Sequence, residues 1–328
     1  MCRCHNICAT RDENMLQKTK SLEKYLGLKN DIKWDTTLFF LLYHALAVYW
    51  CYHYAFPVKW QTLALAYFVY ACNGIGIGAG VHRYWSHRAF KATKPMQLML
   101  FVMYASAGLT TVRRFVRNHR VHHKCSDSDG DPHDARRGLF FSHMGWLMVK
   151  KNEETLRQGK TIDMKDLDND PLIMFHERHM LLVNGTLCFV LPTLANIWFF
   201  GESWRCAVAW QCFIRYLTTM HAAFSVNSLA HKYGHKPYNR NIRPVENLFV
   251  VFATLGEGFH NYHHAFPFDF KGTDRLLTFN IATLTIKLCE KIGWAYDLKE
   301  ASPEMVASMS QRMGDRFQLK EGLSDYSY

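Results

Sequence analysis

The chain has 328 residues, is 49% hydrophobic and 15% aromatic, and carries a formal net charge of +11 with a pI near 9.1. Its ten cysteines lack the close spacing of a small disulfide-rich secreted scaffold, which argues against that class. Its length suits one large domain or two ordinary ones, and its basic charge fits a membrane-surface protein, a binder of anionic substrates or a nucleic-acid binder.

Residues 1–33 are mostly polar and predict a cytosolic N-terminal tail. Because about thirty polar residues precede the first apolar run, no signal peptide is predicted. The opening MCRCHNIC offers four metal-binding side chains, but we interpret it as a reduced, disordered terminus. Those side chains are Cys2, Cys4, His5 and Cys8.

Four apolar runs approach the roughly 20 residues that cross a bilayer. They cover residues 36–56, 61–81, 181–200 and 206–226. Short links at 57–60 and 201–205 join them into two helical hairpins. Arg215 in the last run is expected to face protein or to lie near an end, because a charge facing lipid is costly. The GIGIGAG stretch in the second run predicts close packing of small residues against a neighbouring helix.

The run at 95–112 is marginal in length for a span. If it crossed the membrane, the histidines before and after it would lie on opposite sides and could not share a site. We therefore expect a helix that lies in the membrane interface. Lysines and arginines crowd residues 1–35, whereas the hairpin tips carry only Lys59 and Arg205. This bias predicts that both termini and the loop 82–180 are cytosolic.

Nine of the 18 histidines occur in groups that follow or flank apolar runs at their predicted cytosolic ends. Two HxxHH motifs place imidazoles at i, i+3 and i+4, which share one face of a helix. Neutral imidazoles offer lone pairs to iron, copper, nickel or zinc, and nine exceed the ligands of one ion, so two metal ions are predicted. The nine are His82, His87, His119, His122, His123, His231, His260, His263 and His264.

The remaining histidines have weaker patterns. His44 lies inside a span, and His221 and His235 have no comparable partner spacing, so packing or a hydrogen bond is the preferred interpretation. His176 and His179 form an i, i+3 pair on a charged helix, which more often faces solvent than metal. Glu257, Asp131 and Asp134 are candidates for carboxylates that orient the metal-binding imidazoles through their free N–H groups.

The strings GAGVHRYWSHRAFKA, RNHRVHHK, NSLAHKYGHKPY and GEGFHNYHHAFPFDF resemble the membrane fatty-acyl-CoA desaturases of the stearoyl-CoA Δ9 type. The resemblance covers residues 30–298. It implies an all-α membrane protein, with four transmembrane helices in two hairpins under a cytosolic helical cap that carries a histidine-ligated di-metal site. The expected desaturase domain is 34–298, with the cap formed by 82–180 and 227–298, and a mobile polar tail is expected over 299–328.

The same resemblance implies a function. The enzyme would use O2 and two electrons to introduce a cis double bond, at or near Δ9, into a saturated acyl chain carried as fatty acyl-CoA. The nine histidines would bind two iron ions, a site that zinc can also occupy in purified protein, and Asn227 would reach one metal through water. Cytochrome b5 with its NADH reductase would supply electrons, and the location would be the endoplasmic reticulum membrane.

Desaturation of unactivated methylenes needs an oxidant made from O2, which is the work of a cofactor. The coenzyme A head is polyanionic, and a basic cluster around Arg117, Asn118, Lys150 and Lys151 is expected to hold it. The family usually has FQNDVYEWARDH where this chain has GLTTVRRFVRNH, and often a tryptophan at position 224. Leu109, Phe115 and Phe224 are therefore expected to line an altered, wider acyl tunnel.

Three other classes compete with this interpretation. A metal transporter would place its ligands within the spans, near the bilayer midplane, whereas these histidines are expected at the cytosolic ends. A nucleic-acid binder does not explain why the basic residues flank the spans. A related di-iron fatty-acyl hydroxylase or lipid oxidase shares the ligand set and stays open as the alternative.

Overall fold

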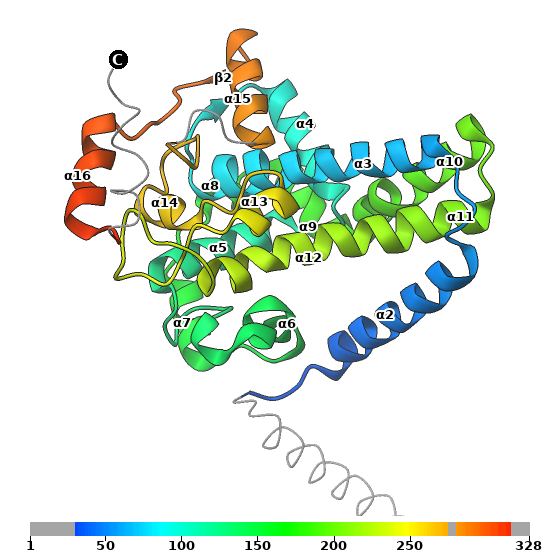
Figure 1. Ribbon diagram of the computed structural model, residues 1–328, viewed down its shortest axis with the longest axis horizontal. Coiled ribbons are helices and arrows are strands. Elements are labelled where there is room, and N and C mark those ends of the chain that lie inside the picture. The colour runs from blue at the N-terminus through cyan, green and yellow to red at the C-terminus, as the bar shows by residue number, and fades with distance from the viewer. Residues whose placement is uncertain (1–29, 275–279, 316–328) are drawn as a thin grey trace, which may run out of the picture.

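The computed structural model describes residues 30–274 and 280–315. These residues are mostly helical, with one two-stranded antiparallel pair, β1 (Lys91–Ala92) and β2 (Ala295–Tyr296). Long helices run side by side through one end of the molecule, and shorter helices gather at the other end (Figure 1). The helix α2 lies along one side of the long helices, partly detached from them (Figure 1). The N-terminal metal-binding side chains from Cys2 to Cys8 lie outside the described residues.

The long helices are continuous rods, and among the described residues all of them except α2 include a π-helical segment. The first rods are α2 (Trp34–Tyr54) and α3 (Trp60–Ile75) with its extension η1 (Gly76–Ser86). The next is α9 (Pro171–Asn184), η4 (Gly185–Val190) and α10 (Leu191–Phe200). The last is α11 (Trp204–Val208), η5 (Ala209–Ile214) and α12 (Arg215–Ser228).

Two of these rods are long and apolar enough to cross a membrane. Residues Trp60–Ser86 and Pro171–Phe200 form helices of 27 and 30 residues, with mean hydropathies of 1.4 and 1.7 over their most apolar windows. Each exceeds the roughly 20 residues that a bilayer requires. Among the described residues, the other two predicted spans do not reach the same standard. Helix α2 is rich in Tyr, Trp and His, and the rod ending in α12 carries Gln211 and Arg215.

Packing against neighbouring helices explains a glycine and an arginine within the rods. A Cβ added at Gly76 would lie 2.2 Å from the backbone nitrogen of Tyr104, so η1 packs directly on the backbone of the next helix, as the glycine run predicts. Arg215 is 2% exposed and bonds to the side chain of Gln211 and to the carbonyl of Cys188. It therefore faces protein, as expected for a charge within an apolar helix.

The remaining helices are short and surround the histidine motifs. They are α4 (Lys94–Ala105), α5 (Val112–Cys125), η2 (Ala135–Arg137), η3 (Phe141–Gly145), α6 (Trp146–Met148), α7 (Glu153–Lys160), α8 (Lys165–Asp168), η6 (Leu229–His231), α13 (Leu248–Thr254), α14 (His260–Ala265), α15 (Ile281–Lys291) and α16 (Pro303–Met313). With 12 residues, α4 is too short to span a bilayer, in agreement with the expectation for 95–112. Its buried face joins η1 in the main hydrophobic core.

The segment after residue 299, which the sequence predicts to be a mobile tail, contains the ordered helix α16. Ser302 caps its first turn, Val306 is buried, and Ser310 bonds to the carbonyl of Pro237. The backbone nitrogen of Arg240 also bonds to the carbonyl of Met313. Helix α16 therefore packs on the end of the molecule that carries the histidines, and residues 316–328 lie outside the described residues.

Candidate metal centre and substrate cavities

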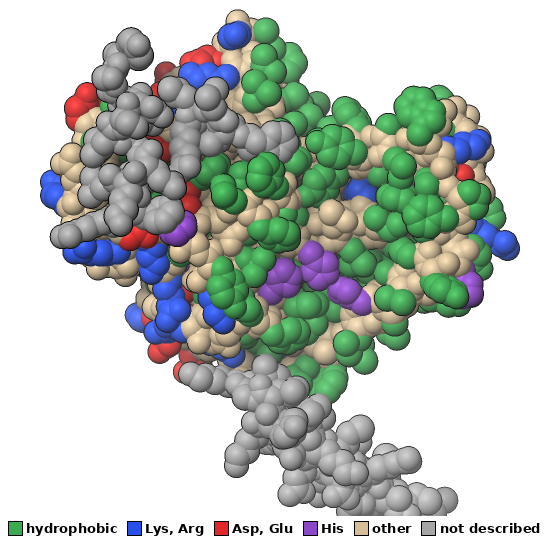
Figure 2. Space-filling view, in the orientation of Figure 1, with side chains coloured by type: hydrophobic (Ala, Val, Ile, Leu, Met, Phe, Trp, Pro, Cys, Tyr) green, Lys and Arg blue, Asp and Glu red, His purple; other side chains and the backbone are tan. Residues whose placement is uncertain are grey.

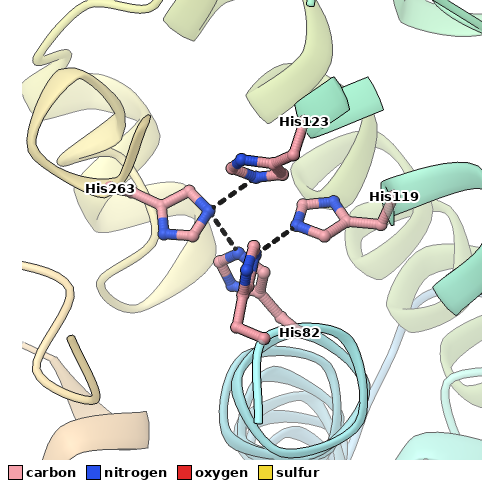
Figure 3. A group of neighbouring side chains, drawn as sticks. His82, His119, His123 and His263 are labelled. Atoms are coloured by element: carbon pink, nitrogen blue, oxygen red, sulfur yellow. Dashed lines mark hydrogen bonds between the residues drawn. The ribbon is translucent and has the colours of Figure 1, made fainter. Parts of the chain in front are cut away.

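The nine predicted histidines form two groups in space. Within each group, one ring nitrogen of every member lies within 4.8 Å of the others. The first group has five members, namely His82, His87, His119, His123 and His263. The second has four, namely His122, His231, His260 and His264. Figure 3 shows four rings of the first group pointing their nitrogens toward a common centre.

Each HxxHH motif is divided between the two groups. On α5, His119 and His123 are at i and i+4 and face the first group, while His122 is turned to the second. On α14, His260 and His264 are at i and i+4 and face the second group, while His263 is turned to the first. The two helices thus lie across both groups, and one helical turn of each supplies ligands to both sides.

Three carboxylates with little solvent exposure hold imidazoles from outside the groups. Glu257 lies 2.6 Å from Nδ1 of His82, and Asp131 lies 2.8 Å from Nδ1 of His122, as the sequence suggests for both acids. Asp127, which no sequence pattern singles out, lies 2.9 Å from Nδ1 of His231. A carboxylate accepts hydrogen bonds, so these Nδ1 atoms carry the protons and the Nε2 atoms turn lone pairs inward.

The prediction for Asp134 is wrong. Its carboxylate caps the turn η2 by accepting from the backbone nitrogen of Arg136 and binds the guanidinium of the same residue at 2.9 to 3.1 Å. Asp127, the first acid of the preceding SDSDGD stretch, orients an imidazole instead, because the loop folds back and brings its carboxylate against His231. No spacing rule along the chain links residues 104 positions apart.

The inward lone pairs test whether metal ions fit. Nε2 of His231 lies 3.0 Å from Nε2 of His260, and Nε2 of His122 lies 3.3 Å from Nε2 of His264. With metal–nitrogen bonds of about 2.1 Å, neighbouring ligand nitrogens lie about 3.0 to 3.4 Å apart. Without a cation, one nitrogen of each such pair must carry a proton and donate to the other, whereas a metal ion binds the lone pairs of both. The donor set therefore fits two metal ions.

Burial keeps most of these rings neutral. Desolvation, followed by the positive charge that neighbouring imidazoles would carry, holds the pKa of six histidines well below the usual value. The six are His87, His119, His123, His260, His263 and His264. Burial also lowers the pKa of His231. Neutral imidazole is the form that binds a metal.

The carboxylates stay ionised in spite of burial. Desolvation would raise the pKa of Glu257, but Arg83 and His82 outweigh it and hold the pKa at about 2. Arg83 donates to Glu257 at 2.6 Å from the side opposite His82. For His122, burial lowers the pKa while the charge of Asp131 raises it, and the net direction is upward.

His133 is a tenth histidine next to the second group, and the sequence motifs do not anticipate it. Its ring lies 4.3 Å from that of His122, and Asp131 is in reach of both rings. Nδ1 of His133 and Nε1 of Trp146 are buried without a hydrogen-bond partner among the described residues. The DPH string that follows the second motif was the available signal.

An apolar cavity of about 460 Å³ reaches the two histidine groups. Its wall includes His82 of the first group and His122 and His260 of the second. Every residue predicted for the acyl tunnel lines this cavity, and so does the asparagine predicted to reach a metal through water. These residues are Leu109, Phe115, Phe224 and Asn227.

A second cavity of about 740 Å³, more polar than the first, lies beside it. Its wall carries five basic side chains and two acidic ones, namely Arg113, Arg117, Lys151, Lys160, Lys165, Asp163 and Asp168. Asn118 lines both cavities and accepts a hydrogen bond from Lys151. Burial, then Arg117 and Lys33, lower the pKa of Lys151 to about 8. Lys150 lines neither cavity and pairs with Asp31 at the surface.

The other histidines of the described residues lie outside both groups. His176 is buried and bonds to Asn184, and His179 is exposed. His44 and His221 bond to each other at 3.0 Å, in agreement with the predicted hydrogen-bonding role of His221.

These features define a helical protein in which two groups of histidines that could each hold a metal ion adjoin an apolar cavity. The model of the fatty acid desaturase family matches residues 56–274, and the chain belongs to this family. An acyl-CoA Δ11 desaturase of Trichoplusia ni is 44% identical over 274 residues, 83% of this chain and 78% of that protein. Two proteins of Acheta domesticus are also similar. Its acyl-CoA Δ9 desaturase is 38% identical, over 92% of this chain and 84% of its own, and its acyl-CoA Δ12 desaturase is 40% identical, over 91% and 84%.

Proposed function

We propose that the chain is an acyl-CoA desaturase that uses O2 and two electrons to introduce a cis double bond, at or near Δ9, into a saturated fatty acyl chain. The observation that carries this proposal is the position of Asn118, which lines both the apolar and the basic cavity. One acyl-CoA molecule can therefore lay its chain beside the histidine groups and its phosphates among the basic residues. The names of the similar proteins agree with this substrate.

The nine histidines, with Asn227 through water, are the proposed ligands of two iron ions. Bound iron would supply the activation of O2 that removal of hydrogen from unactivated methylenes requires. Zinc suits the same donors and can replace iron in purified protein. The carboxylates of Glu257, Asp131 and Asp127 fix the tautomers of three ligands and turn their Nε2 atoms inward.

The chain's own residues bind and orient the substrate. The side chains of Leu109, Phe115 and Phe224 line the apolar cavity and exclude water from the acyl chain. Arg117 and Lys151 are placed to bind phosphate, for which arginine forks and lysine charges are well suited. Lys150, which pairs with Asp31 outside the cavity, is placed to contact only the outer part of the head group.

The altered cavity wall bears on the position of the double bond. Position 224 has phenylalanine where a tryptophan is common in the family, and Leu109 replaces a polar residue. The two similar proteins of Acheta domesticus are named for Δ9 and Δ12 products although both are about equally similar to this chain. Overall similarity therefore does not determine the position, and the lining of the cavity is the proposed determinant.

The membrane arrangement is part of the proposal. Four spans in two hairpins would place the cap residues 82–180 and 227–298 on the cytosolic face of the endoplasmic reticulum, with both termini on that side. Helix α2 supports its assignment as a span through its exposed apolar side chains, including Leu41, Leu42 and Val48. The domain 34–298 would receive electrons at the cytosolic face from cytochrome b5 and its NADH reductase.

Purified protein tests the proposal. Full-length chain in detergent, reconstituted with iron, cytochrome b5, its reductase and NADH, is expected to convert stearoyl-CoA and O2 into a monoene whose double bond mass spectrometry locates. Metal analysis is expected to give two ions per chain. Hydroxylated acyl products would instead identify a di-iron hydroxylase, and a transported metal without lipid product would contradict the proposal.

A further inference from the structure

Leu255 combines an unfavourable backbone conformation with a position in the wall of the apolar cavity. It follows α13 with φ 60° and ψ 32°, in the left-handed region. Four non-glycine residues of the described chain have a positive φ, and Leu255 is the only apolar one. The other three are Arg88, Asp127 and Asp297. Left-handed backbone is unfavourable for residues that carry a Cβ, and aspartate tolerates it better than leucine does.

The turn at the end of α13 explains the conformation of this residue but not its identity. The backbone nitrogen of Gly256 bonds to the carbonyl of Val251 at 2.8 Å, which closes a Schellman turn. Such a turn needs one left-handed residue, and glycine is the usual one because it adopts this conformation without strain. Strained residues are concentrated at ligand-binding and catalytic sites. The reason for a leucine here therefore lies in its side chain.

That side chain packs against a glycine of α3. Leu255 is 6% exposed, and both it and Gly74 line the apolar cavity. A Cβ added at Gly74 would lie 3.3 Å from Cδ1 of Leu255 and 3.3 Å from Cδ1 of Ile281. The isobutyl group of Leu255 thus lies against the bare backbone of α3. With a smaller residue at position 255, the space that this group fills would join the cavity.

Leu255 lies beyond the carboxylate that orients the first histidine group. Gly74, Gly78 and His82 follow one another at intervals of four residues, about one turn each, along the rod of α3 and η1. A Cβ added at Gly78 would lie 2.8 Å from Oε1 of Glu257, whose other oxygen bonds to His82. The contact of Leu255 with the rod is therefore one turn, roughly 6 Å, further from His82 than the contact of Glu257.

An acyl chain would reach this part of the cavity with its methyl end. The basic cavity, which the proposed function assigns to the coenzyme A head, is lined by residues within 113–168, in α5, α7, α8 and adjoining segments. The apolar cavity continues along the rods to Tyr70 and Tyr216. Figure 2 shows charged side chains concentrated at the end of the short helices and hydrophobic side chains over the long helices. The carbons beyond the reacting bond therefore lie beside Leu255.

We propose that Leu255 is a specificity-determining residue that limits the length of the acyl chain beyond the histidine groups. This inference rests on the proposed function. A chain that is too long meets the isobutyl group before its reacting methylenes reach the histidines. The head-group end of the cavity is unaffected by this contact. Leu255 therefore sets the preferred chain length, but not the distance of the double bond from the thioester carbon.

Substitutions at position 255 test this role in the purified, iron-loaded enzyme with palmitoyl-, stearoyl- and arachidoyl-CoA. In Leu255→Ala, the ratio of kcat/KM for arachidoyl-CoA to that for stearoyl-CoA should rise at least about 10-fold, since one methylene in an apolar pocket is typically worth about 10- to 200-fold. Leu255→Phe should raise the ratio of palmitoyl-CoA to stearoyl-CoA instead. Mass spectrometry should locate every double bond at the wild-type distance from the carboxyl carbon.

The strained backbone gives a second, independent signature. Leu255→Gly should enlarge the cavity as Leu255→Ala does, and it should also relieve the left-handed strain. Its thermal unfolding midpoint in detergent should therefore be higher than that of Leu255→Ala, because alanine is destabilising relative to glycine where φ is positive. A lower midpoint for the glycine variant would overturn the argument from strain. If Leu255→Ala does not fold, Leu255→Gly takes its place in the kinetic test.

The matched control is Leu248→Ala. Leu248 lies on the same helix, but 65% of it is exposed and it does not line the apolar cavity. Its substitution should leave the chain-length ratios at their wild-type values. An equal change of the ratios in Leu248→Ala and Leu255→Ala would show that general damage to α13, rather than the cavity wall, is responsible.

Binding separates the role of Leu255 from the proposed function. The wild type and Leu255→Ala, loaded with zinc, would be titrated with the same thioesters by calorimetry. A wild type that binds acyl-CoA but forms no double bond, beside a Leu255→Ala protein with raised relative affinity for arachidoyl-CoA, overturns the proposed function and supports the chain-length role. A wild type that desaturates, beside folded Leu255→Ala and Leu255→Gly enzymes with unchanged ratios or a displaced double bond, overturns the chain-length role alone. A wild type that neither desaturates nor binds acyl-CoA overturns both.

Discussion

Asp127 accepts a hydrogen bond from Nδ1 of His231 at 2.9 Å and so points Nε2 of that imidazole at Nε2 of His260, 3.0 Å away. The carboxylate lies 104 positions before the histidine and belongs to a different loop. It also accepts from the backbone nitrogen of Ala135, which fixes its orientation. The orientation of His231 in the second histidine group therefore depends on a residue that no histidine motif contains.

Asp127→Asn is expected to lower the metal affinity of the second histidine group and to leave that of the first group unchanged. Outer carboxylates of this kind typically contribute about 10- to 100-fold in metal affinity or activity. The metal content of the variant, followed by elemental analysis during titration with a chelator, should fall by one ion per chain before the second ion is lost. The exposed neighbour Asp129 offers a matched control in Asp129→Asn. Simultaneous loss of both ions at the wild-type chelator concentration would count against the assignment.

Phe224→Trp is expected to change the product. The larger indole would occupy part of the apolar cavity that Phe224 lines, and so shift the acyl chain relative to the histidine groups. Mass spectrometry of the fatty acids should show a changed chain-length preference or double-bond position. Phe249→Trp, at an exposed position on α13, should leave the products unchanged. Identical products from both variants would exclude position 224 as a determinant.

The affinity for acyl-CoA is expected to depend on pH through Lys151. Burial and nearby positive charge lower its pKa to about 8, so the ammonium that binds phosphate is lost as pH rises through that value. KM for stearoyl-CoA should therefore increase between about pH 7 and pH 9. Lys151→Arg should remove most of this increase, because a guanidinium stays charged. An equally steep increase in the arginine variant would show that another group is responsible.

Gly76→Ala tests how the fold holds the first metal group. The new Cβ would lie 2.2 Å from the backbone nitrogen of Tyr104, so η1 and α4 must separate. Overpacking of this kind costs about 1–3 kcal/mol, and it would displace His82, which lies further along η1. Thermal unfolding in detergent should show a lower midpoint, together with a lower metal content. Gly159→Ala is the control, because a Cβ at Gly159 would meet open space. An equal drop in unfolding midpoint and metal content in that variant would exclude the packing argument.

Local patterns predict much of this molecule. Six of the nine histidines follow from repeated i, i+3, i+4 spacing, and the other three from their positions beside the predicted cytosolic ends of apolar runs. The close packing of the glycine run follows from its small residues. Two of the four predicted spans are long and apolar enough to be recognised in the structure, whereas α2 and the rod ending in α12 are diluted by aromatic and polar side chains. The resemblance to desaturases, carried by long strings around the histidines, agrees with the family of the chain.

Contacts between distant segments are not predictable in this way. The sequence favours Asp134 over Asp127 because nothing local shows which acid the loop turns toward His231. The bond between His44 and His221 joins residues 177 positions apart on two rods. Hydrogen bonds to Pro237 and Arg240, which lie far away along the chain, hold helix α16 in place. Polarity alone predicts a mobile segment there.

Expression in yeast that lacks its own Δ9 desaturase tests the central claim most directly. The fatty acids would be analysed by mass spectrometry with each double bond located, and a His263→Ala variant would be expressed in parallel. We predict new monoenes from the wild type that are absent from the variant, because His263 lies 2.9 Å from both His82 and His123 in the first metal group. Folded, iron-loaded wild-type protein that yields no new monoene, or monoenes that persist in His263→Ala, would contradict the proposed function.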